Sequence, residues 1–397
     1  MNPSAAASPS RMTKISNKDV SEGPQPGKRA LVHIRELDGV RGIAALAVFF
    51  HHVCFTSISE QGWSGGIRLL SRLSQYGATG VDLFFVLSGF LITSLLIEDR
   101  GSSRYYHDFY WKRALRILPL YLVCLLGVLV FYPHSGGYVL MSALFVANFA
   151  WLFHLDPSGP FWTLAIEEQF YLVWPTVVRR RSIEAISNWA VVIGLSAVIL
   201  RLIAACWGHH NYQFTFFHCD GLAMGAWLSC RFERWNRLGF RSPRDKVAWA
   251  AGLVLAIVLI VLAFHMPAGP RADAFSAAFL QTAITLIAGA WIAFLLVHRG
   301  KPFLGIFRSR ILIFFGLISY AMYMIHRYVM LAYDHFEGPL PAGDVAAYSI
   351  RFFAVLGITI ALCLLSRYLL ELPASSLRRY VIAPATHKSA ASVRISN

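Results

Sequence analysis

The sequence predicts an all-α polytopic integral membrane protein with about ten transmembrane helices and both termini in the cytosol. Hydrophobic residues make up 56% of the 397 residues and charged residues 14%, whereas a soluble domain carries about 25% charged residues. The apolar residues come in repeated blocks of about 20, the length at which a helix crosses a bilayer. The basic residues collect in alternate loops. This composition excludes a soluble globular enzyme.

Ten apolar blocks are candidate spans. They cover residues 40–58, 77–97, 114–132, 160–178, 187–206, 214–230, 247–265, 275–297, 311–333 and 346–370. An eleventh block, 138–153, is short and is bounded by two glycines and by the turn-forming run 156–160. If it also crossed the membrane, the basic loops near 179–186 and 231–246 would no longer lie on the same side as the other basic loops. We therefore expect 138–153 to be re-entrant or interfacial.

The basic residues fix the expected orientation. With ten crossings, most of the 36 Lys and Arg residues fall on one side, together with both termini. The opposite loops hold only Arg68, Arg72 and Arg271. Positive charge marks cytosolic loops, so both termini are predicted in the cytosol. The formal net charge of +15 is explained by topology, and no nucleic-acid partner is expected.

The chain divides into three predicted parts. Residues 1–36 are polar, rich in Ser and Lys and without an apolar core, which favours a disordered cytosolic tail over a cleaved signal peptide. Residues 37–374 form the transmembrane domain, and 375–397 form a cytosolic C-terminal tail. The six cysteines lie almost entirely in apolar stretches without metal-like pairing. We therefore expect no disulfide framework and no metal site.

The first span carries charged and ionisable side chains that membrane helices normally exclude. His52 follows Arg41 by eleven positions, which puts them on one helical face roughly 16 Å apart along the axis. His51 lies about 80° away around the helix and is the weaker partner. An imidazole suits a general base, and an arginine suits a phosphate or carboxylate. The alternatives are a hydrogen-bonded packing role for His52 and a structural pair between Asp38 and Arg41.

The fourth span carries two adjacent carboxylates, Glu167 and Glu168. At least one should face a cavity or a cation, because a buried unpaired carboxylate is costly. Glu167 shares a helical face with Tyr171 and Trp174, a lining that suits a sugar or acyl pocket. Glu168 is expected to pair with an Arg or His from another helix.

The third span begins with a basic cluster. Lys112, Arg113 and Arg116 have the spacing of one helical face at the cytosolic mouth. Such a cluster can enforce topology, or it can bind a polyphosphate that arrives from the cytosol.

The other polar candidates are less specific. Ser88 and Gly89 in the second span favour close helix packing. The remaining candidates are Asp82 near the outer end of that span, His218 with Asp220, Ser319 with Tyr323 and His326 on one helical face, and Glu371 as an anchoring ion pair.

Taken in order, these strings resemble the bacterial membrane acyltransferase-3 family, which O-acylates cell-surface polysaccharides, lipopolysaccharide, Nod factors and macrolide antibiotics. The resemblance covers about residues 36–374. The strings are the Arg-x10-His of Arg41 and His52, the Ser-Gly-Phe at 88–90, the basic pair before Arg116-Ile-Leu-Pro-Leu-Tyr, the Trp-Thr-Leu-x-x-Glu at 162–167, and Ser319-Tyr to His326. Where such proteins often have an Arg two residues before the Asp of the sixth span, this chain has His218.

The resemblance implies an O-acyltransferase of the bacterial inner membrane. The donor would be acetyl-CoA or another acyl-CoA from the cytosol, and the acceptor a hydroxyl of an exopolysaccharide, lipopolysaccharide or glycolipid. The implied catalytic residues are His52, Arg41 and Glu167, and Arg113 with Arg116 would bind the donor. We further expect substrate contacts from Asp38, Asp82, Tyr171 and His326. His52 would act as a general base or take the acyl group itself.

Two other functional classes use similar residues. A transporter or flippase for a lipid-linked glycan also needs intramembrane Arg, His and Glu, and inverted repeats would favour it, but none is apparent in the sequence. A glycan polymerase or ligase normally has a large outer loop, whereas the predicted outer loops here are short.

Overall fold

The computed structural model describes residues 34–55, 65–155, 159–209, 213–238, 242–338 and 344–377. Within these residues the regular structure is helical and no strand occurs. Most of the two expected tails, 1–36 and 375–397, lies outside the described residues.

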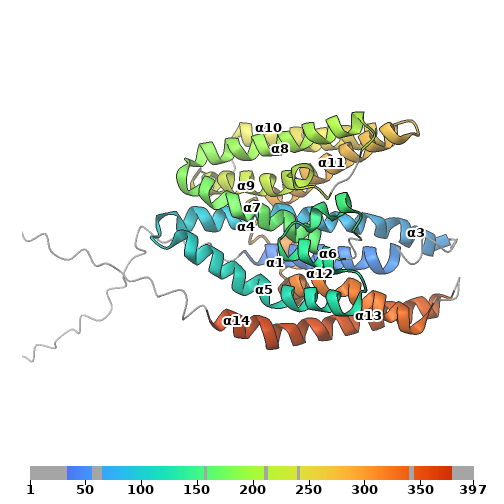
Figure 1. Ribbon diagram of the computed structural model, residues 1–397. Helices are drawn as coiled ribbons and strands as arrows, with labels where there is room; N and C mark the ends of the chain where they lie inside the picture. Colours follow the sequence, from blue (N-terminus) through green and yellow to red (C-terminus); the bar gives the residue numbers. More distant parts are fainter. Residues whose placement is uncertain are drawn as a thin grey trace, which may run out of the picture.

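Each of the ten predicted spans overlaps a long helix, and residues 56–58 of the first span lie outside the described residues. These helices are α1 (Arg35–Phe50), α4 (Gly80–Glu98), α5 (Tyr105–Phe131), α7 (Phe161–Arg180), α8 (Ile183–Cys206), α9 (Thr215–Leu238), α10 (Pro243–Phe264), α11 (Pro270–Val297), α12 (Arg310–Glu337) and α13 (Val345–Ser366). They run along a common direction, with α8 and α10 at one edge of the bundle and α13 at the other (Figure 1). Helices α1, α4 and α12 lie between these edges.

Shorter elements cap and connect the long helices. They are the π-helices η1 (His51–Phe55) and η7 (Arg367–Glu371), the helices α3 (Gly65–Ser74), α6 (Gly136–Ala143) and α14 (Leu372–Ser376), and the 3-10 helices η3 (Gln75–Thr79), η4 (Asp99–Gly101), η5 (Ala147–Phe153) and η6 (Pro302–Arg308). Both π-helices continue a long helix, η1 after α1 and η7 after α13. Wide turns of this kind frequently occur at functional sites.

Eight helical segments of the described chain are long and apolar enough to cross a membrane. They contain every long helix except α7 and α9. Helix α7 has 20 residues, but the polar run of Glu167, Glu168 and Gln169 lowers its mean hydropathy. Helix α9 has 24 residues and includes several charged side chains. The protein is thus an all-helical polytopic membrane protein, and the tenfold crossing with cytosolic termini stays a prediction.

The segment 138–153 is not one long helix. It consists of α6, with eight residues, and η5, with seven, and an α-helix of eight residues is only about 12 Å long. The Tyr121 hydroxyl donates to the Ser142 carbonyl (2.7 Å), and the Gln169 amide donates to the Phe145 carbonyl (2.8 Å) and to Asn148 Oδ1 (2.9 Å). The bond to Phe145 satisfies a carbonyl between α6 and η5, where the backbone is not helical, as a membrane environment demands.

Glycines let the central helices approach closely. A Cβ at Gly42 would lie 2.1 Å from the Leu312 carbonyl oxygen, and one at Gly316 would lie 2.0 Å from that of Asp38. Helices α1 and α12 are therefore in backbone contact. The close packing expected of Gly89 is confirmed, because a Cβ there would lie 2.0 Å from the Leu222 carbonyl oxygen on α9.

We expect Gly89→Ala to destabilise the protein by about 1–3 kcal/mol, because the added methyl group meets backbone that can move only with its helix. Gly127→Ala is the control, since a Cβ at Gly127 in α5 would meet nothing within 4 Å. The measurement is the midpoint of thermal unfolding in detergent. Equal midpoints for the two variants would contradict the backbone contact between α4 and α9.

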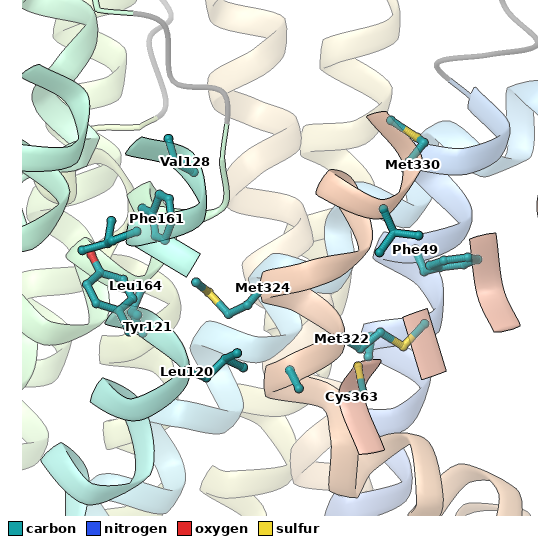
Figure 2. Packing of buried hydrophobic residues seen from close by; sticks show 14 of the residues in the cluster. Phe49, Leu120, Tyr121, Val128, Phe161, Leu164, Met322, Met324, Met330 and Cys363 are labelled. Atoms are coloured by element: carbon teal, nitrogen blue, oxygen red, sulfur yellow. The ribbon is translucent and has the colours of Figure 1, made fainter. Parts of the chain in front are cut away.

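The core around the candidate site is apolar and comes from α1, α5, α7, α12 and α13. Figure 2 shows that Met324 points from α12 toward Leu120 and Leu164, whereas Met322 lies on the other side of the helix near Cys363. Helix α12 is therefore packed against apolar side chains on two sides, which holds the helix and its polar side chains in place.

Candidate active site

A cavity of about 570 Å³ lies among α1, α4, α5, α7 and α12. It brings together four of the predicted site residues, Arg41 from α1, Arg113 and Arg116 from α5, and Glu167 from α7. The other polar side chains of the lining are Ser88, Lys112, Thr163, Ser319, Tyr320 and Tyr323. Side chains far apart in the sequence thus converge on one chamber with four cationic groups and one carboxylate. Such a chamber suits an anionic ligand.

The two adjacent carboxylates on α7 have different surroundings: Glu167 lines the cavity, and Glu168 lies next to a cation. Ser88 Oγ donates a 2.8 Å hydrogen bond to Glu167 Oε1, so Ser88 does more than permit close packing. Glu168 Oε1 lies 3.7 Å from Arg113 Nε, which confirms the expected pairing of Glu168 with an Arg. The guanidinium of Arg113 also lies 3.8 Å from the ring centre of the buried Tyr171. Arg113 is therefore held by an ion pair and a cation–π contact.

Arg41 stands between two cavities. The second cavity, of about 410 Å³, is lined by both Arg41 and Arg116, and its other charged side chains are Asp38, Arg367 and Glu371. Asp38, predicted as a substrate contact or a tether for Arg41, shares this second cavity with it. The π-helix η7 supplies Arg367 and Glu371. A ligand longer than the first chamber could therefore extend past Arg41 without leaving charged surroundings.

His52 is part of an imidazole pair. His326 Nδ1 lies 2.8 Å from the Met322 carbonyl oxygen, and His326 Nε2 lies 3.0 Å from His52 Nδ1. A carbonyl can only accept, so Nδ1 of His326 carries the proton and its Nε2 accepts from His52 Nδ1–H. The same His52 Nδ1–H is 3.1 Å from the Val48 carbonyl oxygen. In this tautomer the lone pair of His52 is on Nε2, which is therefore the ring atom that can accept a proton.

The imidazole pair lies beyond the described lining of the first cavity. Tyr323, which lines the cavity, has its ring centre 6.3 Å from that of His326 and 6.2 Å from that of Phe84. Thr163 Oγ1 donates to the Tyr323 hydroxyl (2.8 Å). Tyr323 and its neighbours thus stand between the cationic chamber and the imidazoles. The helical spacing of Arg41 and His52 predicts that they share a face of α1. It does not predict that the first cavity includes Arg41 and ends before His52.

Asp82 lies outside both cavities, in a separate polar cluster. Its Oδ1 accepts from Gln281 Nε2 (2.6 Å) and lies 3.2 Å from His218 Nε2. Asp220 is bound by Arg201 of α8 (2.8 Å). The chain therefore supplies an Arg for Asp220 from a neighbouring helix, and the His that departs from the resembled pattern contacts Asp82 instead.

The Asp82 cluster is almost fully buried. Relative exposure is 6% for Asp82 and 4% for Asp220. The described partners of Asp82 lie on α9 and α11, and those of Asp220 lie on α8 and α11. The two carboxylates together connect α4, α8, α9 and α11. Among the described residues, no group of three or more His, Cys, Asp or Glu side chains is gathered as metal ligands would be.

Comparisons with known proteins identify the family of this chain. Residues 34–368 match the acyltransferase domain family. Among relatives, a protein named "Putative O-acetyltransferase" from Staphylococcus aureus (strain COL) is 26% identical over 86% of this chain and 57% of its own length. A "Putative peptidoglycan O-acetyltransferase" from Bacillus subtilis is 28% identical over 74% of this chain and 48% of its own length.

A shorter match is somewhat closer in sequence. The peptidoglycan O-acetyltransferase of Listeria monocytogenes is 32% identical over 36% of this chain and 24% of its own length. The chain spans about half the length of the first two relatives. No solved structure matches.

Proposed function

The chain belongs to the acyltransferase domain family, and we propose that it moves an acyl group from cytosolic acyl-CoA to a hydroxyl of a carbohydrate acceptor. Acetyl is the preferred group, because the relatives above are named O-acetyltransferases. The acceptor is an exopolysaccharide, a lipopolysaccharide, a glycolipid or peptidoglycan, and the enzyme acts in the bacterial inner membrane.

One observation supports this proposal above the others: the chamber that combines Arg41, Arg113, Arg116 and Glu167. Coenzyme A is an elongated polyanion, and guanidinium groups bind phosphates with two parallel hydrogen bonds. We place the donor phosphates on the α5 arginines and on Arg41, with the thioester directed toward Tyr323. Glu167 contacts the substrate within the chamber. The second cavity gives the donor room to extend.

The imidazole pair provides the base. His52 Nε2 takes the proton of the acceptor hydroxyl, whose oxygen attacks the thioester carbonyl and forms the new C–O bond. As the C–S bond breaks, the CoA thiolate leaves and takes the proton from His52. His326 accepts from His52 Nδ1–H and stabilises the imidazolium that forms in between. In the covalent variant, His52 Nε2 attacks the thioester carbonyl, and the C–S bond breaks to release the CoA thiolate. The hydroxyl oxygen then attacks the acyl-imidazole, the C–N bond breaks to free His52, and the hydroxyl proton goes to the thiolate.

The test uses the purified protein in nanodiscs with radiolabelled acetyl-CoA and a surface-glycan extract. We expect release of CoA and transfer of the label to glycan. If labelled acetyl-CoA stays intact while a lipid-linked glycan is moved across the membrane, the protein is a flippase and the proposal is wrong.

We expect Leu91→Trp to raise the KM for acetyl-CoA by at least about tenfold, because Leu91 lines the first cavity and an indole would fill space that the donor needs. Leu122→Trp is the matched control. Leu122 is 56% exposed on the outer surface of α5, where a larger side chain meets lipid. Equal effects of the two variants on KM would contradict donor binding in this chamber.

A further inference from the structure

A buried arginine on α13 joins the two helical segments that carry the imidazoles. Arg351 is 2% exposed. Its Nε and Nη2 donate to the two carboxylate oxygens of Asp334 at 2.6 and 2.7 Å, and its Nη1 donates to the Val53 carbonyl oxygen at 2.9 Å. Three hydrogen bonds from one planar group thus connect α13, the end of α12 and the π-helix η1.

The bond to Val53 acts next to His52. The last carbonyls of a helix have no partner within the helix, and η1 ends at Phe55. Arg351 caps one of these carbonyls from a different helix. Val53 directly follows His52 in the sequence. The hydrogen bond from Arg351 to the Val53 carbonyl therefore fixes the backbone next to His52.

The bond to Asp334 acts on the other imidazole. Asp334 follows His326 by eight residues on α12, a little more than two turns. Because α12 is a continuous helix, fixing Asp334 fixes the height and rotation of His326. One guanidinium therefore sets both sides of the 3.0 Å contact between His52 and His326.

We propose that Arg351 is a positioning residue that holds His52 and His326 at hydrogen-bond distance. This inference rests on the proposed function, in which that pair supplies the base. Asp334 neutralises Arg351 through both carboxylate oxygens, so Arg351 acts through geometry and not as a binding site for an anionic substrate. An arginine is needed at this position because its planar guanidinium can donate to the Asp334 carboxylate and the Val53 carbonyl at the same time.

A double-mutant cycle separates positioning from general stabilisation. We expect Arg351→Lys and His326→Gln each to lower kcat for acetyl-CoA by roughly 10- to 100-fold, with the donor KM changed by less than about twofold. If Arg351 acts through the pair, kcat of the double variant is no more than about threefold below kcat of the less active single variant, because the pair is already lost in each single variant. A purely structural role predicts that the two losses multiply.

Arg201→Lys is the matched control. Arg201 is as buried as Arg351 and forms an ion pair with Asp220 (2.8 Å), but it lies on α8 and its described partners lie on α9 and α11. Any effect of Arg201→Lys should therefore multiply with that of His326→Gln. Multiplying losses for Arg351→Lys with His326→Gln would overturn the proposal. Asp334→Asn, on a half-exposed side chain, repeats the cycle if Arg351→Lys does not fold.

A spectroscopic measurement decides the inference without any activity. Nitrogen-15 spectra of histidine-labelled protein in bilayers report whether His52 and His326 share a hydrogen bond, and His52→Gln identifies their signals. We expect the coupled signals in the native protein and their loss in Arg351→Lys. Unchanged signals in that variant would overturn the inference. Absence of acetyl-CoA turnover in the native protein would overturn only the proposed function.

Discussion

Replacing His52 with Gln should lower the turnover of acetyl-CoA by at least about a hundredfold, because a general base contributes typically 10²–10⁴ in rate. Gln has similar size and can keep a hydrogen bond to the Val48 carbonyl, which His52 Nδ1 makes at 3.1 Å. The protein should therefore stay folded in the membrane. The measurement is kcat from CoA release, with the unfolding midpoint measured in parallel.

His51→Gln is the control for this prediction. His51 is the adjacent imidazole of the same π-helix, and its Nδ1 lies 3.1 Å from the Ser74 carbonyl oxygen. It makes a contact with the neighbouring segment and has no part in the proposed chemistry, so kcat should change by less than about threefold. Retained turnover in His52→Gln, or an equal loss in His51→Gln, would show that His52 is not the base.

The second large effect is expected at Arg41. We expect Arg41→Gln to lower kcat/KM for acetyl-CoA by about 100-fold, which corresponds to about 2.7 kcal/mol and is typical of a charge-assisted hydrogen bond to phosphate. Arg41 lines both cavities, so a donor that extends through them must pass it. The loss should appear mainly in KM.

A donor without phosphates reveals what Arg41 binds. Acetyl-pantetheine carries the same thioester as acetyl-CoA but none of its phosphates. If Arg41 binds phosphate, Arg41→Gln and the native protein should use acetyl-pantetheine equally well, within about twofold. An equal loss with both donors would instead assign Arg41 to the developing oxyanion at the thioester carbonyl.

Much of the helical layout was readable from the sequence, because a membrane allows few alternatives. Lipid offers no hydrogen bonds, so an apolar block of about 20 residues is a helix, and all ten blocks overlap long helices. The same cost explains why exceptional residues could be singled out. Arg41, Arg113, Arg116 and Glu167 are expensive in lipid, and they do converge on one chamber.

The contacts between distant helices were not readable in this way. The periodicity of one helix says which side chains share a face, but not which other helix covers that face. The pairing of His52 with His326 and of Asp82 with Gln281 both join spans far apart in the sequence. The sequence analysis named both His52 and His326, but it did not predict that the two imidazoles contact each other or that His326 sets the tautomer of His52.

The π-helices were also unpredicted. The segment His51–Phe55 contains no Gly or Pro, which would be the usual sign of a break in a helix. The wide turn instead coincides with contacts from outside, namely Arg351 on the Val53 carbonyl and His326 on His52. Such a turn has no signal in the local sequence, because the contacts found at it come from residues far away in the chain.

The backbone contact between α1 and α12 affects how the protein is made. His52 and His326 are 274 residues apart, and at about 5–20 residues per second a ribosome needs roughly 14–55 s to synthesise that length. During this interval the first helix must wait in the bilayer with Asp38, Arg41 and two histidines but without its partner. Nascent chains that stop before α12 would leave Gly42 and the polar side chains of α1 without their partner helix, and we expect cellular proteases to remove them.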